Sequence, residues 1–117
     1  MPRSTAAYLA DIIEACAAVE DVLRGIDLQT YQQTRSIRSS VERELILIGE
    51  AVSVLGRTDP ASYQRISHAR LIIGLRNILT HDYPAVDDET LYGVAGSDLP
   101  VLRRECAALL EGLGDAR

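Results

Sequence analysis

The sequence predicts an all-α protein of four to five main helices. Apolar residues recur at spacings of three and four along most of the chain, as expected for helices with one buried face. No segment shows the strict alternation of a strand. The composition agrees, because the core must rest on small and branched aliphatic residues: the chain has five tyrosines and neither tryptophan nor phenylalanine.

Length and charge set further limits. A chain of 117 residues fits one domain, here residues 1–117, and can bury a core without disulfides or metals. The formal net charge of −5 argues against non-specific nucleic-acid binding by the whole surface. The charge is unevenly spread, however, with a net +3 over residues 35–76 and a net −5 over residues 77–98.

Cysteine usage and hydropathy predict a cytoplasmic protein. Cys16 and Cys106 lie in apolar helical patterns and match no metal-binding or redox spacing, so we expect buried free thiols in a reducing compartment. No signal or transit peptide is visible, and the apolar runs are too short to cross a bilayer. We expect neither a cofactor nor a membrane partner.

The first helix is expected to run from Ser4 or Thr5, either of which can cap it, to about Leu23. Gly25 follows and can adopt the left-handed conformation that ends helices. The residues expected to face the core are Leu9, Ile12, Ile13, Cys16, Val19 and Leu23.

Asp27 can cap a short helix over residues 28–33. A long second helix is then expected from about Thr34 to Leu55, with Gly56 ending it. Its apolar stripe is the clearest in the sequence and consists of Ile37, Val41, Leu45, Ile48, Val52 and Leu55.

Asp59 precedes a proline suited to a first helical turn, which predicts a short turn over residues 61–66. The third main helix should begin at His68 or Ala69 and reach about residue 82. Pro84 forces its end, because the residue before a proline is disfavoured in the helical conformation.

The last part of the chain predicts two helices. Asp87 or Asp88 can cap a short one that ends near Ser97, since two glycines and a proline make a continuous helix unfavourable. Asp98 should then cap a final helix with Pro100 in its first turn. The final helix should bury Leu99, Leu102, Cys106, Leu109 and Leu113.

The third helix has two faces of different character. At 100° per residue, one arc of about 160° holds its polar side chains. These are Arg76, Asn77, Thr80, His81 and Tyr83. The opposite face is apolar and contains Leu71, Ile72, Leu75, Ile78 and Leu79. Such a helix packs one face into a core and presents the other to a ligand or another chain.

Arg76 and His81 have residue types suited to metal-independent RNA cleavage. An arginine presents a planar fork to phosphate, and a histidine can accept and donate a proton near neutral pH. The 2′-hydroxyl must lose a proton and the leaving 5′-oxygen must gain one, so two copies of the arc from two subunits would serve best. The alternative is that both residues form surface or interface salt bridges.

We consider four other polar residues as candidate site residues, and two of them have two possible roles. Tyr83, in the last turn before Pro84, is either an accessible functional hydroxyl or an interface aromatic. Asn77 is within reach of His81 and can orient its ring, or it is an interface amide. Glu50, inside an apolar stripe, is expected to pair with an arginine of a neighbouring helix, and His68 is expected to be solvated and without a role.

Taken together, these segments resemble the HepT-like proteins, toxin components within the HEPN (higher eukaryote and prokaryote nucleotide-binding) superfamily. The resemblance covers nearly the whole chain. Its segments are Tyr8-Leu9-Ala10-Asp11-Ile12, Val41-Glu42-Arg43 with Ile48-Gly49-Glu50-Ala51, the stretch from Ile73 to Tyr83, and Asp98-Leu99-Pro100 with Leu102. The third contains the family's defining pattern in full, an arginine, four residues, a histidine, one residue and a tyrosine.

The resemblance implies a HEPN-like, up-and-down helical bundle that acts as a homodimer. It implies a toxin with metal-independent endoribonuclease activity, in which Arg76 and His81 are the catalytic pair and RNA is the substrate. It also implies an MntA-like nucleotidyltransferase antitoxin as partner, which neutralises the toxin by AMPylation of Tyr83. The alternative function is a non-catalytic HEPN adaptor that binds a nucleotide or a partner through the same polar arc.

Overall fold

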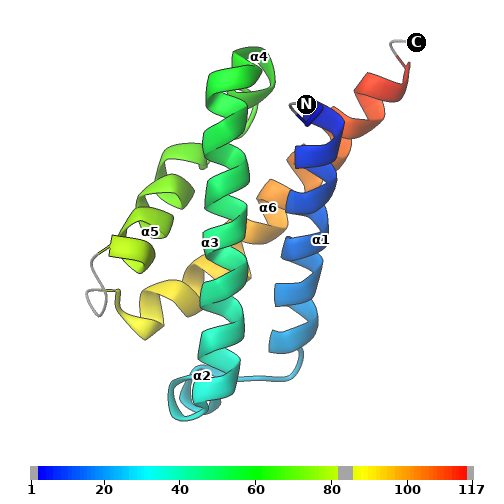
Figure 1. The fold of residues 1–117 in the computed structure, drawn as a ribbon. Coiled ribbons are helices and arrows are strands. Elements are labelled where there is room, and N and C mark those ends of the chain that lie inside the picture. The colour runs from blue at the N-terminus through cyan, green and yellow to red at the C-terminus, as the bar shows by residue number, and fades with distance from the viewer. Residues whose placement is uncertain (1–2, 82–85, 116–117) are drawn as a thin grey trace.

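The computed structural model describes residues 3–81 and 86–115 and confirms the all-α prediction. No strand occurs among these residues. Four of the helices described here are long and two are short, and the last helix is the longest (Figure 1). The helices are α1 (Thr5–Leu23), α2 (Leu28–Gln33), α3 (Arg35–Thr58), α4 (Pro60–Tyr63), α5 (Ala69–His81) and α6 (Asp88–Asp115).

The long helices form two layers. In Figure 1, α1, α3 and α5 run up and down beside one another, and α6 crosses obliquely behind them. The helix α3 lies centrally, since it packs extensively against both α1 and α5, while α1 also packs against α6. Within the described part of the chain, no helix is both long enough and apolar enough to cross a membrane.

Side-chain caps explain where the helices begin. The hydroxyl of Ser4 accepts a hydrogen bond from the backbone N–H of Ala7 at 3.1 Å, and the carboxylate of Asp27 accepts one from Thr30 at 2.8 Å. Asp87 caps α6 in the same way. Each cap satisfies a backbone donor that the first helical turn leaves without a partner. Gly25, at φ 75°, has the left-handed conformation predicted for it.

The core follows the predicted stripes closely. The predicted inner side chains of α1 and α3 are buried except for Ile13, in the middle of the first stripe, and Leu23 and Ile37, at stripe ends, which are partly exposed. Cys16 and Cys106 are buried free thiols, as predicted. Burial raises the pKa of each thiol to about 12, so both remain protonated at neutral pH.

The predicted end of α3 at Gly56 is wrong. The helix continues to Thr58, and Gly56 instead provides room for a neighbouring aromatic ring. A Cβ at Gly56 would lie 3.2 Å from the ring of Tyr63 in α4. The chain turns at Asp59, whose carboxylate accepts hydrogen bonds from Ser62 and from Thr5 and so fixes α4 to the start of α1.

The predicted break near Pro100 is also wrong, because α6 is one helix of 28 residues with this proline inside it. Apolar positions keep the helical spacing across the proline, and a break would expose part of that stripe. The buried members are Leu91, Val94, Ala95, Leu99, Leu102 and Cys106. Burial of each large member contributes about 1.5–3 kcal/mol, which together exceeds the roughly 3 kcal/mol that an interior proline costs.

We predict that Pro100→Ala stabilises the protein. Inside a continuous helix the substitution restores a backbone donor and removes a steric conflict, so the free energy of unfolding should rise by about 1–3 kcal/mol. Urea denaturation followed by circular dichroism measures this. Pro60→Ala is the matched control, since Pro60 lies in the first turn of α4, where proline is well tolerated. An equal or lower stability of Pro100→Ala would mean that α6 is interrupted there.

Candidate functional site

The helix that carries the candidate site, α5, is fixed at its beginning by α6. The backbone N–H of Ser67 donates to the carboxylate of Glu105 at 3.1 Å, and the hydroxyl of Ser67 donates to the same group. His68 Nδ1 lies 3.0 Å from Asp98 Oδ1, within ion-pair distance but without hydrogen-bond geometry. His68 is therefore not simply solvated, as the sequence had indicated; it faces α6.

The two predicted faces of α5 are present. Ile72, Leu75 and Leu79 are buried against the rest of the bundle, while Asn77, Thr80 and His81 are exposed. Leu71 was predicted on the buried face and is 45% exposed instead. It lies 100° from Ile72 around the helix, beyond the width of the face that α3 covers.

The central contact between α5 and α3 is made at Gly49. A Cβ at this buried glycine would lie 2.3 Å from the Cβ of Arg76 and 3.3 Å from the carbonyl oxygen of Ile72. Real Cβ atoms do not approach that closely. The absence of a side chain at Gly49 therefore brings the backbone of α5 against α3 at the position of Arg76.

This approach brings Arg76 next to Glu50, the residue after Gly49. The guanidinium Nε of Arg76 donates to Glu50 Oε2 at 2.9 Å, and Nη2 donates to the same oxygen. Nη1 donates to Asn77 Oδ1 at 2.7 Å. The structure thus confirms that Glu50 pairs with an arginine of a neighbouring helix. Asn77 bonds to Arg76, and no hydrogen bond joins it to His81 in the described part of the chain.

The pairing orients Arg76 more than it stabilises the fold. The side chain of Glu50 is 59% exposed, and exposed ion pairs contribute little to stability. The guanidinium has five N–H groups, of which three are engaged by Glu50 and Asn77. The remaining two, one on each terminal nitrogen, have no partner among residues 3–81 and 86–115 and could donate to an anion such as a phosphodiester.

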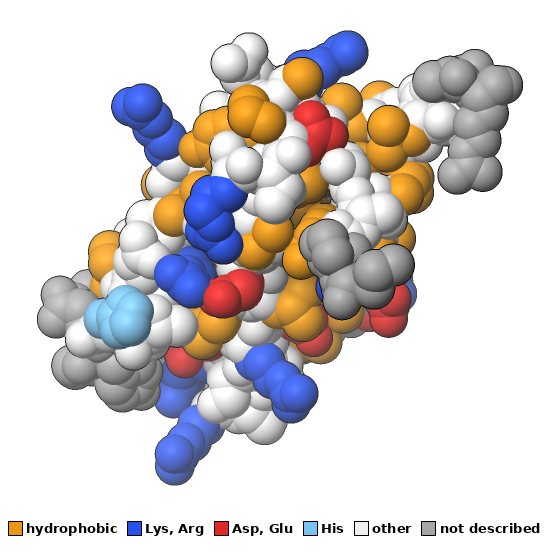
Figure 2. Space-filling model, turned by 45° about the horizontal axis from the view of Figure 1, so that its top comes forward, with side chains coloured by type: hydrophobic (Ala, Val, Ile, Leu, Met, Phe, Trp, Pro, Cys, Tyr) orange, Lys and Arg blue, Asp and Glu red, His pale blue; other side chains and the backbone are white. Residues whose placement is uncertain are grey.

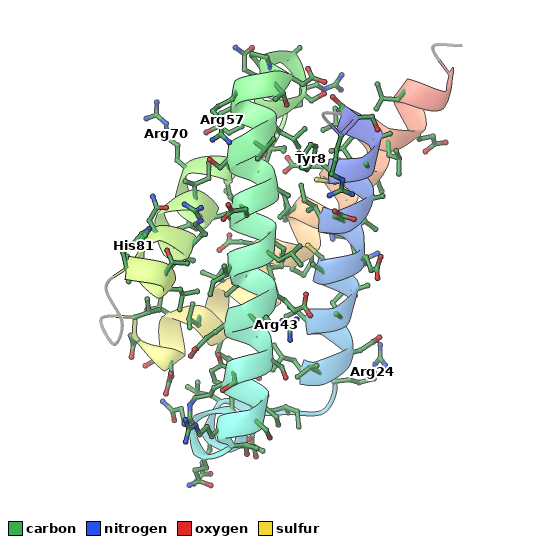
Figure 3. The ribbon with its side chains drawn as sticks, viewed as in Figure 1. Tyr8, Arg24, Arg43, Arg57, Arg70 and His81 are labelled. Carbon is green, nitrogen blue, oxygen red and sulfur yellow. The ribbon has the colours of Figure 1, made fainter. Side chains whose placement is uncertain are left out.

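His81 is the last residue of α5 and points away from the bundle in Figure 3. It is exposed and follows Arg76 by five residues, which places it about 140° around the helix and about 7.5 Å along the axis. Thr80, between them, donates its hydroxyl to the carbonyl oxygen of Arg76 at 2.9 Å. Tyr83 lies outside the described residues.

A groove of about 400 Å³ adjoins this site between α1 and α3. Glu50 lines one end of it, and Tyr8, Arg43 and Leu47 line the rest. Within residues 3–81 and 86–115, no three His, Cys, Asp or Glu side chains gather in a way that could hold a metal ion. These residues offer a guanidinium cation held in one orientation and an exposed imidazole.

Comparisons with known proteins find relatives that are named as ribonucleases. The family model described as HepT-like, "Ribonuclease HepT-like", matches residues 12–109. A Methanocaldococcus jannaschii protein named "Putative RNase" is 30% identical over 103 residues, 88% of this chain and 94% of the relative. A Thermococcus cleftensis protein named "Probable ribonuclease HepT" is 30% identical over 106 residues, 88% of this chain and 93% of the relative. No solved structure gives a significant match.

We predict that Gly49→Ala destabilises the protein and displaces Arg76. The added methyl group must push α5 away from α3, since the Cβ of Arg76 is fixed to its backbone, and overpacking of this kind costs about 1–3 kcal/mol. Chemical denaturation measures the decrease in the free energy of unfolding. Gly74→Ala is the matched control in α5, where a Cβ meets nothing within 4 Å and should add about 1 kcal/mol of stability. Parent-like stability of Gly49→Ala would contradict the close contact.

Proposed function

Because the chain belongs to the HepT-like ribonuclease family, we propose that it is an RNA endonuclease whose catalytic residues are Arg76 and His81. The observation that supports this proposal is the orientation of the Arg76 guanidinium by its hydrogen bonds. Glu50 and Asn77 fix its guanidinium at the surface of α5 and leave two donors free for a phosphate. His81 is exposed on the same helix.

The proposed reaction is an attack by the ribose 2′-oxygen on the adjacent phosphorus. The 2′-oxygen loses its proton to a base, the bond from phosphorus to the 5′-oxygen breaks, and an acid protonates that oxygen. The products are a 2′,3′-cyclic phosphate and a 5′-hydroxyl. Imidazole side chains serve as base and acid, and the guanidinium stabilises the charge on the non-bridging oxygens.

We propose that a homodimer carries out this reaction. One imidazole cannot serve both sides of an in-line displacement, and His81 lies about 140° around α5 from Arg76. Two α5 helices facing a shared cleft would supply two imidazoles and two guanidinium groups. The dimer would therefore complete a site that a single chain provides only in half.

We further propose that the protein is the toxin of a toxin–antitoxin pair, inactivated when an MntA-like nucleotidyltransferase transfers AMP to Tyr83. In this transfer the tyrosine oxygen forms a bond to the α-phosphorus of ATP and pyrophosphate leaves. Tyr83 follows Arg76 by seven residues, two helical turns if α5 continued to it. An AMP group there would bring a negative charge that competes with RNA for Arg76 and a base that obstructs access.

We predict that His81→Ala reduces RNA cleavage by about 10²–10⁴-fold, the contribution expected of a general acid or base. Fluorescent single-stranded RNA incubated with purified protein and EDTA measures the rate, and the parent should remain active in the chelator. His68→Ala is the matched control, because it removes the other histidine of the chain, which faces Asp98 instead of solvent near Arg76. Its rate should stay near that of the parent.

Equal cleavage by His81→Ala and the parent would overturn the proposed catalytic pair. A parent that binds the antitoxin but cleaves no RNA would favour the adaptor function instead. The acidic net charge of −5 agrees with that second function, since it weakens RNA binding by the surface as a whole.

We predict that Tyr83→Phe abolishes modification of the protein. Co-expression with a nucleotidyltransferase encoded next to it, followed by intact mass spectrometry, should show one or more AMP units on the parent and none on the variant. Tyr8→Phe is the control and should be modified like the parent, because Tyr8 belongs to α1. Modification that persists in Tyr83→Phe would place the acceptor elsewhere.

A further inference from the structure

The segment that leads into the candidate site contains basic residues and no acidic ones. From residue 60 to residue 81 the chain has three arginines and both of its histidines, and neither aspartate nor glutamate. This is unexpected in a chain whose net charge is −5. The acidic excess therefore lies on other parts of the protein. On α5, the charge of Arg76 is paired with Glu50, and the other positive charge faces no acid of the same segment.

The packing of α3 on α5 adds a further arginine to this surface. The two helices run in opposite directions in Figure 1, and Gly49 meets Arg76 at their contact. The last turn of α3, with Arg57, therefore lies beside the first turn of α5, with Arg70. Figure 3 shows Arg57 and Arg70 at this end and His81 at the other end of α5, and Figure 2 shows arginine side chains spread over this face.

Arg57 and Arg70 are available to a ligand. Both are exposed, and neither forms an ion pair with a described residue. Among the described residues, the one hydrogen bond of the Arg57 guanidinium is to the hydroxyl of Ser53, at 3.2 Å. By contrast, Arg103 is tied to Glu20 and Arg38 approaches Asp88, so those guanidinium groups are already neutralised within the fold.

We propose that Arg57 and Arg70 bind the phosphodiester backbone of single-stranded RNA and lead it along α5 to Arg76 and His81. The inference rests on the proposed function. It adds a path for the RNA substrate along Arg57 and Arg70, which we call the substrate track. Arg70 precedes Arg76 by about 9 Å and His81 by about 16 Å along the helix axis, so the track is long enough for more than one phosphate. Arg57 on α3 and Arg70 on α5 are separate point contacts, which suit a flexible RNA strand, and their guanidinium forks match phosphate oxygens.

The role of Arg57 and Arg70 would be to position RNA, not to take part in the chemistry. Contacts of this kind weaken as the salt concentration rises, because a phosphate that is bound by an arginine releases its counterions. Each contact to a single strand changes the slope of log affinity against log salt concentration by about 0.7. They carry no sequence information, so their loss should weaken binding to all sequences alike.

The test is RNA binding by the double variant Arg57→Gln/Arg70→Gln in a His81→Ala background, which prevents cleavage during the measurement. Fluorescence anisotropy with a labelled single-stranded RNA gives Kd over a range of salt concentrations. The salt slope should fall by about 1.4 relative to the background protein, since two contacts are removed. In the cleavage-competent protein the same two substitutions should raise KM and leave kcat unchanged.

The matched control is Arg24→Gln/Arg35→Gln, which removes the same charge at two exposed positions, one just after α1 and one at the first residue of α3, the end of that helix opposite to Arg57. The slope of log affinity against log salt concentration for this control should equal that of the His81→Ala background protein. Equal slopes for the two double variants would overturn the substrate track while leaving the catalytic proposal intact. Absence of cleavage by the parent, together with the expected difference in slopes, would overturn the catalytic proposal and leave the RNA-binding surface standing.

Discussion

The contact between α3 and α5 at Gly49 determines the geometry of the candidate site. Only a residue without a side chain allows the Cβ of Arg76 to lie where it does. The neighbouring position on α3 then places Glu50 against the guanidinium, and the neighbouring position on α5 places Asn77 on its other side. The glycine thus fixes the separation of two helices, and the separation fixes the orientation of the arginine.

This orientation reconciles an acidic protein with an anionic substrate. A carboxylate beside the arginine proposed to bind phosphate weakens the attraction for RNA. It also holds the guanidinium in one position, so less conformational entropy would be lost on binding a phosphate. The solvent exposure of Glu50 limits the electrostatic cost. All the other acids lie outside the stretch from residue 60 to residue 81, along which the RNA is proposed to bind.

Most of the fold could be predicted from the sequence, because apolar spacing and capping residues report directly on local structure. The pairing of Glu50 with an arginine followed from the cost of leaving a carboxylate alone in an apolar stripe. The errors have a common cause: Gly56 and Pro100 were interpreted by local preference, whereas packing against Tyr63 and against the core decides both. That Gly49 would meet Arg76 could not be predicted, since spacing within one helix does not give its register on another.

The sequence separation of the stabilising contacts has a consequence for the order of folding. Glu50 and Arg76 are 26 residues apart, while Glu20 and Arg103, which join α1 to α6, are 83 residues apart. Closing the longer loop costs about 1 kcal/mol more in chain entropy. The helix pair that carries the site can therefore form as a local unit, and α6 can dock onto it last. During synthesis, Arg76 would meet Glu50 before the end of the chain has left the ribosome.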